Sequence, residues 1–292
     1  MQNFPFKQVL KKAWQLVKTN KLLWIIGIFV GSASMALDPP GEDWQGLHVD
    51  SVGQVLINVK NFLSNPLLAL YALMVFVFFI AIVLASFWAR VAMLEGIRKD
   101  RNGEKLQFGQ LLKFGFGKMP RILLMEIILG VVNLILGVII FFTSVVNQDN
   151  NFTLNIIFLI AVLALVIYNV VLFMFRHYAY CFAVLEDCKA LPAIKSGWKL
   201  FRQNARPLIV VKLIEVGLWM AGGIAAIIIL AVCTAPFLLL GLILMVVVGA
   251  LAWTIVAMLA VIALIIVLLV ISGVLNTFFQ SYLTYAYWQV KK

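Results

Sequence analysis

The sequence predicts an all-α integral membrane protein with six transmembrane helices, and a seventh is possible. Hydrophobic residues make up 64% of the 292 and charged residues 12%, whereas soluble domains carry about 45–50% apolar and about 25% charged residues. Several uncharged runs exceed the roughly 20 residues that a helix needs to cross the hydrocarbon core. They lie at 66–89, 122–146 with Glu126 as the single exception, 152–175 and 216–289.

The positive charges predict how the chain crosses the membrane. Of 23 Lys and Arg residues, 22 fall in four blocks at 7–21, 90–121, 176–212 and 291–292. The connections between these blocks are nearly free of cations, as the positive-inside rule requires of loops outside the cytoplasm. Both termini are therefore expected on the cytoplasmic side of the membrane. The net charge of +11 then reflects topology and attraction to anionic lipid headgroups, which disfavours nucleic-acid binding.

The first element is a surface helix that recurs later in the chain. Residues 11–20 align without a gap with residues 195–204, sharing Lys, Trp, Leu and Asn at equivalent positions. In both copies apolar residues follow the i, i+3, i+4 spacing and the cations take the other face, which is typical of a helix lying in the headgroup plane. Trp14 and Trp198 are then the interfacial anchors. A weaker third copy lies around residues 108–118.

Each surface helix leads into an outward span and returns through an inward span. Two outward spans are expected to open at Pro120 and Pro207, because proline is tolerated in the first turn of a helix. The inward spans end alike, at residues 92–95, 183–186 and 286–289. The chain therefore reads as a single membrane domain, 1–292, with internal repeats at about 4–99, 106–187 and 190–290.

Two segments depart from this repeat. Residues 234–252 are apolar and contain Pro236. A re-entrant or outer-leaflet helix there agrees better with the charge rule than a seventh span. The connection after the first span is acidic, and the capping-box pattern at residues 51–54 predicts a second interfacial helix at 52–63 on the outer face.

Ionisable residues within spans are the first candidates for function, because burying them is costly unless they are paired or hydrated. Glu126 and Glu215 lie about 9 and 12 Å past Pro120 and Pro207. Lys212 precedes Glu215 by three residues, and Arg90 and Arg176 close neighbouring inward spans at comparable depth. These five residues are candidates either for structural ion pairs, the favoured interpretation, or for a proton or cation relay.

Amides and small residues mark contacts between helices. Polar side chains within spans occur at Asn133, Asn169, Asn276 and Gln280. They are expected to form interhelical hydrogen bonds, with the lining of a solute path as the alternative. Two small-residue steps, Gly27 with Gly31 and Gly222 and Gly223 with Ala226, predict close helix packing.

No catalytic, metal or cofactor constellation is visible. The histidines are His48 and His177, which gives a histidine metal site or a Ser/His/Asp triad little to build on. A phosphate-binding loop ending in Gly-Lys-Ser/Thr is also missing. We therefore expect a protein that is not an enzyme.

The surface-helix pattern Lys-x-Ala/Gly-Trp-x-Leu-x-Lys/Arg-x-Asn, together with the Ala-x-Leu-Glu helix end, resembles uncharacterised prokaryotic multi-pass proteins similar to the membrane domain found beside glycerophosphodiester phosphodiesterases. The resemblance implies a bacterial or archaeal cytoplasmic membrane and a lipid-related role. In that family the catalytic residues belong to a separate soluble domain, so none is carried over. The favoured function is a non-enzymatic scaffold or accessory protein that engages anionic lipid, a protein partner or a second copy. The alternative is a transporter of a small solute or lipid.

Overall fold

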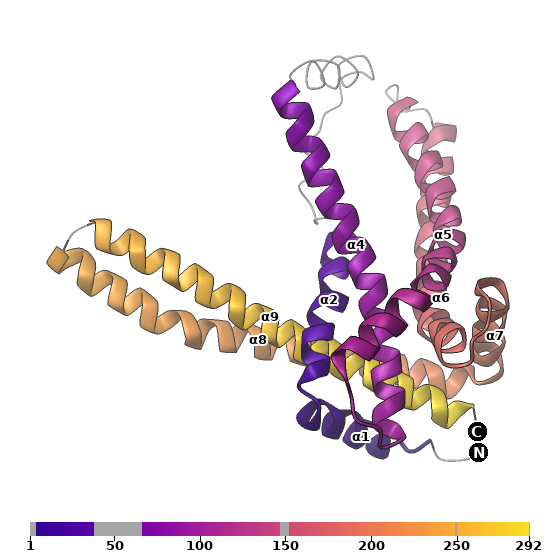
Figure 1. Cartoon of the computed structure of the whole chain (residues 1–292). Helices are drawn as coiled ribbons and strands as arrows, with labels where there is room; N and C mark the ends of the chain where they lie inside the picture. Colours follow the sequence, from indigo (N-terminus) through magenta and orange to yellow (C-terminus); the bar gives the residue numbers. More distant parts are fainter. Residues whose placement is uncertain (1–3, 38–65, 147–151, 249, 292) are drawn as a thin grey trace. The chain divides into compact units, whose positions relative to one another are not determined.

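A computed structural model describes residues 4–37, 66–146, 152–248 and 250–291, and every element in these ranges is an α-helix (Figure 1). This confirms the all-α membrane prediction. The expected helix at 52–63 lies outside the described residues. The helices are α1 (Phe6–Thr19), α2 (Leu22–Leu37), α4 (Pro66–Arg101), α5 (Phe108–Val146), α6 (Phe152–Leu185), α7 (Ala190–Gln203), α8 (Ala205–Val248) and α9 (Ala250–Val290).

Five of the described helices, α4, α5, α6, α8 and α9, are long and apolar enough to cross a membrane. The expected first span corresponds to α2, which has 16 residues. At 1.5 Å per residue α2 is about 24 Å long, shorter than the roughly 30 Å of hydrocarbon. The helices thus match the predicted order of spans, while the number that cross the membrane stays a prediction.

Helices α8 and α9 are much longer than expected. They contain 44 and 41 residues, which corresponds to about 66 and 61 Å. The predicted separate helix at 234–252 does not exist: residues 234–248 are the end of α8, and α9 begins at Ala250. Pro236 lies inside α8 and does not end it, as membrane helices tolerate a proline where local adjustment and neighbouring groups satisfy the freed backbone carbonyl.

Pro120 gives a second correction. The sequence predicts a surface helix around 108–118 and a separate span beginning at Pro120, but α5 is one helix of 39 residues with Pro120 inside it. Membrane helices tolerate such a proline because local adjustment and neighbouring groups satisfy the freed carbonyl. Pro207, in contrast, lies in the first turn of α8, where a missing N–H does no harm.

The chain forms two compact units. Unit 1 comprises Met1–Gly31, Ala92–Lys113 and Arg202–Lys292, and unit 2 comprises Ser32–Val91 and Phe114–Phe201. Helices α4 and α5 contribute to both units. Each unit therefore has its own packing, which is described separately below.

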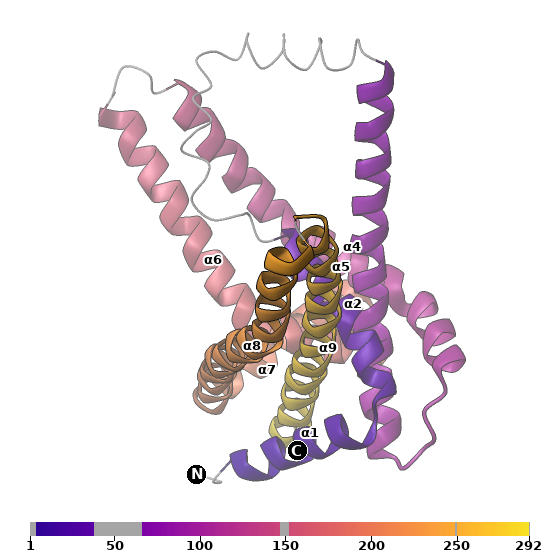
Figure 2. The same cartoon turned by 90° about the vertical axis from the view of Figure 1, so that its left-hand side faces the viewer.

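In unit 1, α8 and α9 form an antiparallel hairpin, and α1 lies across the C-terminal half of α9 (Figure 2). Their contact is a buried core of Val9, Ala13, Val211, Tyr282, Leu283 and Ala286. The Tyr282 hydroxyl donates to the carbonyl of Val211 at 3.4 Å. The N-terminal helix is thus packed against the C-terminal helix of the chain.

Helices α2 and α9 touch through their backbones. A Cβ atom on Gly27 would collide with the carbonyl oxygen of Gly273 and lie 2.7 Å from Thr277 Oγ1. Thr277 Oγ1 also donates to the carbonyl of Leu23 at 2.9 Å. The first small-residue step is therefore a close helix contact. In the second step, Gly222 faces Leu275, while a Cβ on Gly223 would meet open space.

In unit 2, small residues again allow close packing. A Cβ on Gly197 of α7 would lie 2.8 Å from the backbone nitrogen of Ala179 in α6. A Cβ on Gly115 of α5 would lie 3.2 Å from the carbonyl oxygen of Trp88 in α4. When the three inward-helix ends are aligned, Trp88, Ala179 and Tyr282 occupy the same position. The small residues that pack there are Gly115, Gly197 and, in unit 1, Ala13. Each predicted surface helix therefore places a small residue against the equivalent position of an inward helix. The repeat boundaries stay a prediction.

Candidate lipid-binding groove and intramembrane charge sites

Glu126 and Arg176 form an ion pair between α5 and α6 in unit 2. Arg176 Nε lies 2.7 Å from Glu126 Oε1, and Arg176 Nη2 contacts Oε2. The two parallel contacts are the bidentate geometry that suits a guanidinium and a carboxylate. The Arg176 side chain is 34% exposed and that of Glu126 is 15% exposed, so the pair is open on one side.

Arg90 joins the same group through Tyr180. Arg90 Nη1 donates to the Tyr180 hydroxyl at 3.3 Å, and Arg176 Nε donates to the same oxygen at 2.5 Å. The Arg90 guanidinium also packs against the rings of Phe87 and Tyr180, with about 6 Å to each centroid. We call Arg90, Glu126, Arg176 and Tyr180 the arginine cluster. It unites three of the five predicted charges.

Lys212 and Glu215 form a separate pair in unit 1. Lys212 Nζ lies 2.8 Å from Glu215 Oε2, and the side chains are 4% and 8% exposed. Oε2 has this charge contact but no well-directed hydrogen bond. The spacing of three residues on α8 brings the two groups together within one helix turn. The sequence-predicted charges are thus divided between the two units.

The span amides have three different environments. Asn133 and Asn169 exchange hydrogen bonds of 3.1 and 3.4 Å and join α5 to α6. Asn276 donates within α9, to the carbonyl and hydroxyl of Ser272 at 2.8 and 3.1 Å. Gln280 is half-buried, and its backbone carbonyl accepts a hydrogen bond from Thr284 Oγ1 at 2.7 Å.

Trp14 and Trp198 have similar surroundings in the two units. Trp14 is 49% exposed and meets Phe278 of α9 edge-on at 6.0 Å. Trp198 is 41% exposed and meets Phe175 of α6 edge-on at 5.5 Å. Lys18 Nζ also lies 5.4 Å from the Trp14 ring centroid, so each indole combines an apolar contact with a half-exposed edge.

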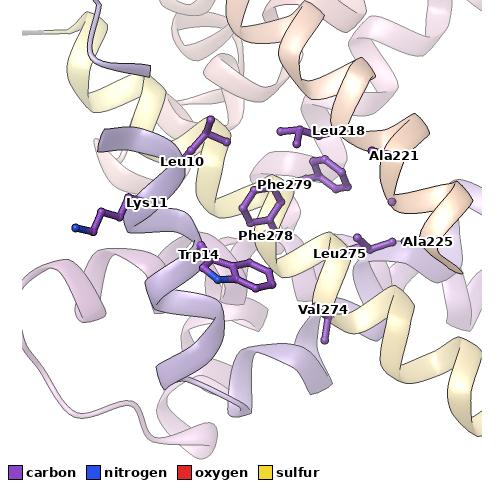
Figure 3. Close-up of a pocket in the computed structure, with 11 residues that line it drawn as sticks. Leu10, Lys11, Trp14, Leu218, Ala221, Ala225, Val274, Leu275, Phe278 and Phe279 are labelled. Atoms are coloured by element: carbon purple, nitrogen blue, oxygen red, sulfur yellow. The ribbon is translucent and has the colours of Figure 1, made fainter. Parts of the chain in front are cut away.

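A groove with a volume of about 550 Å³ opens beside Trp14 in unit 1 (Figure 3). We call it the α1 groove. Its walls come from α1, α8 and α9 and consist of Leu10, Lys11, Trp14, Leu218, Ala221, Gly222, Ala225, Val274, Leu275, Phe278 and Phe279. The side chain of Lys11 extends away from the aromatic rings (Figure 3), which leaves an apolar interior with a cation at its rim.

The sequence did not point to the α1 groove because its walls come from helices far apart in the chain. Small residues on α8, namely Ala221, Gly222 and Ala225, leave space that larger side chains would fill. The small-residue step at Gly222 was the only available signal. Tyr180 was also missed, because a tyrosine within an apolar run has no distinctive sequence pattern.

A third polar group in unit 2 lies at the turn between α6 and α7. Asp187 contacts both Lys118 and Arg121 of α5, and Arg121 Nη1 also donates to the Asp187 carbonyl at 3.1 Å. The hydrogen bonds from Lys118 and then Arg121 hold the pKa of the Asp187 carboxyl below its ordinary value. Asp187 has φ of 60°, a left-handed conformation that Asp and Asn adopt more readily than most residues.

Within the described residues, no group of three or more His, Cys, Asp or Glu side chains is placed to hold a metal ion. The titratable groups that do converge are the arginine cluster, the Lys212–Glu215 pair and the group around Asp187. Their chemistry is charge pairing and hydrogen bonding.

Comparison with known proteins gives a family for the whole membrane region. No curated protein and no solved structure matches the chain. The model of a family of unknown function, DUF7544, matches residues 13–289, which include the arginine cluster, both tryptophan contacts and nearly all of the α1 groove. The chain therefore belongs to the DUF7544 family.

Proposed function

We propose that this multi-pass helical protein is a non-enzymatic membrane scaffold or accessory protein that engages anionic lipid through α1 and the α1 groove. The observation that carries the proposal is the combination of an apolar groove with a lysine at its rim. A lipid acyl chain suits the apolar walls, and a negative headgroup suits the cation. The resemblance to membrane domains beside glycerophosphodiester phosphodiesterases agrees with a lipid-related role.

The surface of α1 supports this proposal. The helix buries Val9, Ala13, Leu16 and Val17. Its four lysines, Lys7, Lys11, Lys12 and Lys18, are all exposed. Each lysine near an anionic membrane surface contributes about 1 kcal/mol of attraction, and their aliphatic stems can lie along apolar surface. Lys11 lines the groove and Lys18 lies over the ring of Trp14, so α1 offers two cations beside the groove.

The paired carboxylates favour a scaffold over a transporter. Glu126 and Glu215 are each in contact with a cation, and Glu215 is also almost completely buried, whereas a relay or solute path requires a carboxylate that water or substrate can reach. The alternative, a transporter of a small solute or lipid, would use the same groove as an entry for lipid. Movement of labelled lipid between leaflets of proteoliposomes would favour that alternative.

The test is native mass spectrometry of the purified full-length protein in mixed micelles containing phosphatidylglycerol or phosphatidylcholine. We expect phosphatidylglycerol to be retained preferentially. Gly222→Leu should reduce its retention by filling the groove. Gly223→Leu is the matched control, because it adds the same side chain at the neighbouring residue, where a Cβ meets open space.

A triple variant, Lys7→Gln with Lys11→Gln and Lys12→Gln, separates charge from shape. It should remove the preference for phosphatidylglycerol while leaving the apolar walls of the groove unchanged. Equal retention of both lipids by the wild-type protein would overturn the proposal. Loss in the triple variant with full retention in Gly222→Leu would show that the lipid binds the lysines outside the groove.

A further inference from the structure

The hydroxyl of Tyr180 in unit 2 is surrounded by hydrogen-bond donors. It accepts one hydrogen bond from Arg176 Nε at 2.5 Å and one from Arg90 Nη1 at 3.3 Å. A guanidinium can only donate, so the phenol oxygen is the acceptor in both bonds. Its own hydrogen must point elsewhere, and within the described part of the chain it has no acceptor.

A second donor lacks a partner at the same place. Arg90 Nε is buried and makes no hydrogen bond to any described residue. The Arg90 and Arg176 atoms that bind Tyr180 can be no more than about 6 Å apart, since they share one acceptor. Two unused donors, Arg90 Nε–H and Tyr180 O–H, are therefore close to each other and to two guanidinium groups.

The charges in the arginine cluster do not balance. Arg90 and Arg176 bring two positive charges and Glu126 brings one negative charge, and both Glu126 oxygens already contact Arg176. A cation without a counter-charge is unfavourable in an apolar setting. Lys212 and Glu215 in unit 1, in contrast, are one cation and one anion. The arginine cluster therefore lacks one negative charge, and the unit 1 pair does not.

We propose that Arg90, Arg176 and Tyr180 form a binding site for one oxyanion of the phosphate class. Guanidinium groups bind phosphate oxygens through charge-assisted, often bidentate hydrogen bonds. A tyrosine hydroxyl adds a neutral donor to the same oxyanion. The bound group supplies both the missing charge and the missing acceptors. This site is independent of the α1 groove, because it lies wholly within unit 2.

The distance of Arg90 from the basic end of α4 allows two sources for the oxyanion. Arg90 precedes Arg98, the first residue of the basic end of α4, by eight residues, or about 12 Å along the helix. The headgroup layer adds only about 5–8 Å on each side of the hydrocarbon core. Either a lipid phosphate is drawn inward or a small dissolved oxyanion enters. Both sources present the same phosphate oxygens to the cluster.

The test measures the melting temperature of the full-length protein in detergent with low-millimolar phosphate or sulfate against chloride at equal ionic strength. A second arm replaces the salt by micellar phosphatidylglycerol. A ligand that binds the folded state raises the melting temperature with its concentration. We expect a saturable rise in at least one arm, and the arm that responds identifies the source.

Tyr180→Phe keeps the ring that packs against both arginines and removes only the hydroxyl. The loss of one hydrogen bond to a charged group should weaken the oxyanion response at least about tenfold. Arg90→Gln should abolish the response. The matched control is Tyr282→Phe, which removes a hydroxyl beside the neutral pair of unit 1 and should leave the response unchanged.

Three results would overturn the proposal. The first is no saturable response of the wild-type protein in either arm. The second is an undiminished response in Tyr180→Phe, and this variant remains informative if Arg90→Gln fails to fold. The third is an equal loss of response in Tyr180→Phe and Tyr282→Phe, which would indicate general destabilisation instead of a site.

Discussion

The two units hold their intramembrane charges in different ways. In unit 1, Lys212 and Glu215 come from one turn of α8, balance each other and are almost completely buried. In unit 2, Arg90, Arg176 and Glu126 come from three helices, carry an excess positive charge and are partly open, with Arg176 34% exposed. A closed, neutral pair suits a structural role. A cluster with an excess positive charge suits the binding of a further, negatively charged group.

Two contacts between helices differ in a similar way, although unit 2 also has a close backbone contact between Gly197 and Ala179. In unit 1, α2 and α9 touch through backbone at Gly27 and Gly273, which leaves no space for a side chain. In unit 2, α5 and α6 are joined by the Asn133–Asn169 hydrogen bonds, whose geometry is more adjustable. We therefore expect a larger side chain at Gly27 to cost more stability than a change at the Asn133–Asn169 contact.

The largest effect is expected at Lys212 and Glu215. Glu215→Gln or Lys212→Met should each destabilise the protein by about 3–5 kcal/mol, because the remaining buried charge loses its partner. The double variant should recover much of that loss. The measurement is a double-mutant cycle of unfolding free energies in mixed micelles containing increasing sodium dodecyl sulfate. Additive losses would mean that the two side chains do not interact and would weaken the contrast between the units.

The second effect concerns the backbone contact of α2 with α9. Gly27→Leu should cost about 3 kcal/mol, the upper end for overpacking, because its Cβ meets a backbone oxygen that cannot rotate away. Gly137→Leu in unit 2 is the matched control, since a Cβ there meets open space. It should be neutral or slightly stabilising, as leucine favours helix more than glycine does. Equal losses at both positions would contradict the close contact.

These two predictions also show which contacts can be predicted from the sequence. Lys212 and Glu215 could be paired in advance because a spacing of three residues fixes them on one helix face. The contact at Gly27 was indicated by its small-residue step, but its partner Gly273 was not, because glycine spacing does not identify the opposing helix. The long uncharged runs determined the fold class.

Contacts between helices were harder to predict. The sequence offered both Arg90 and Arg176 as partners for Glu126, and the choice depends on how each helix is rotated about its axis. The continuity of α5 through Pro120 and of α8 through Pro236 was missed for a related reason. An internal proline removes one backbone hydrogen bond and its ring crowds the preceding turn, and packing around the helix decides whether the helix ends there.

The third effect concerns the Glu126–Arg176 pair of the arginine cluster. Glu126→Gln should cost about 1–2 kcal/mol, less than the usual value for a hydrogen bond to a buried charge, because Arg176 remains partly accessible. The same cycle with Arg176→Gln should give a coupling energy smaller than that of Lys212 with Glu215. A coupling as large as in unit 1 would mean that the arginine cluster is closed and would remove the contrast.

The smallest effect is expected at Asp187, whose side chain is 63% exposed. Hydrogen bonds from Lys118 and Arg121 hold its pKa below the ordinary value of 3.8. A carboxyl whose pKa is lower in the folded state contributes stability above the unfolded pKa, and this is lost as the pH falls through the folded pKa. Wild type should therefore melt slightly above Asp187→Asn at pH 7, and this difference should disappear as the pH falls below about 3.8.

Asparagine is the right replacement because Asp187 has φ of 60°, which Asn tolerates and Ala does not. Asp187→Asn thus changes the charge and keeps the backbone, whereas Asp187→Ala should melt lower than Asp187→Asn at every pH because it adds strain. The two variants separate the electrostatic contribution from the conformational one. A difference between wild type and Asp187→Asn that persists unchanged well below pH 3.8 would show that charge pairing with Lys118 and Arg121 is not its source.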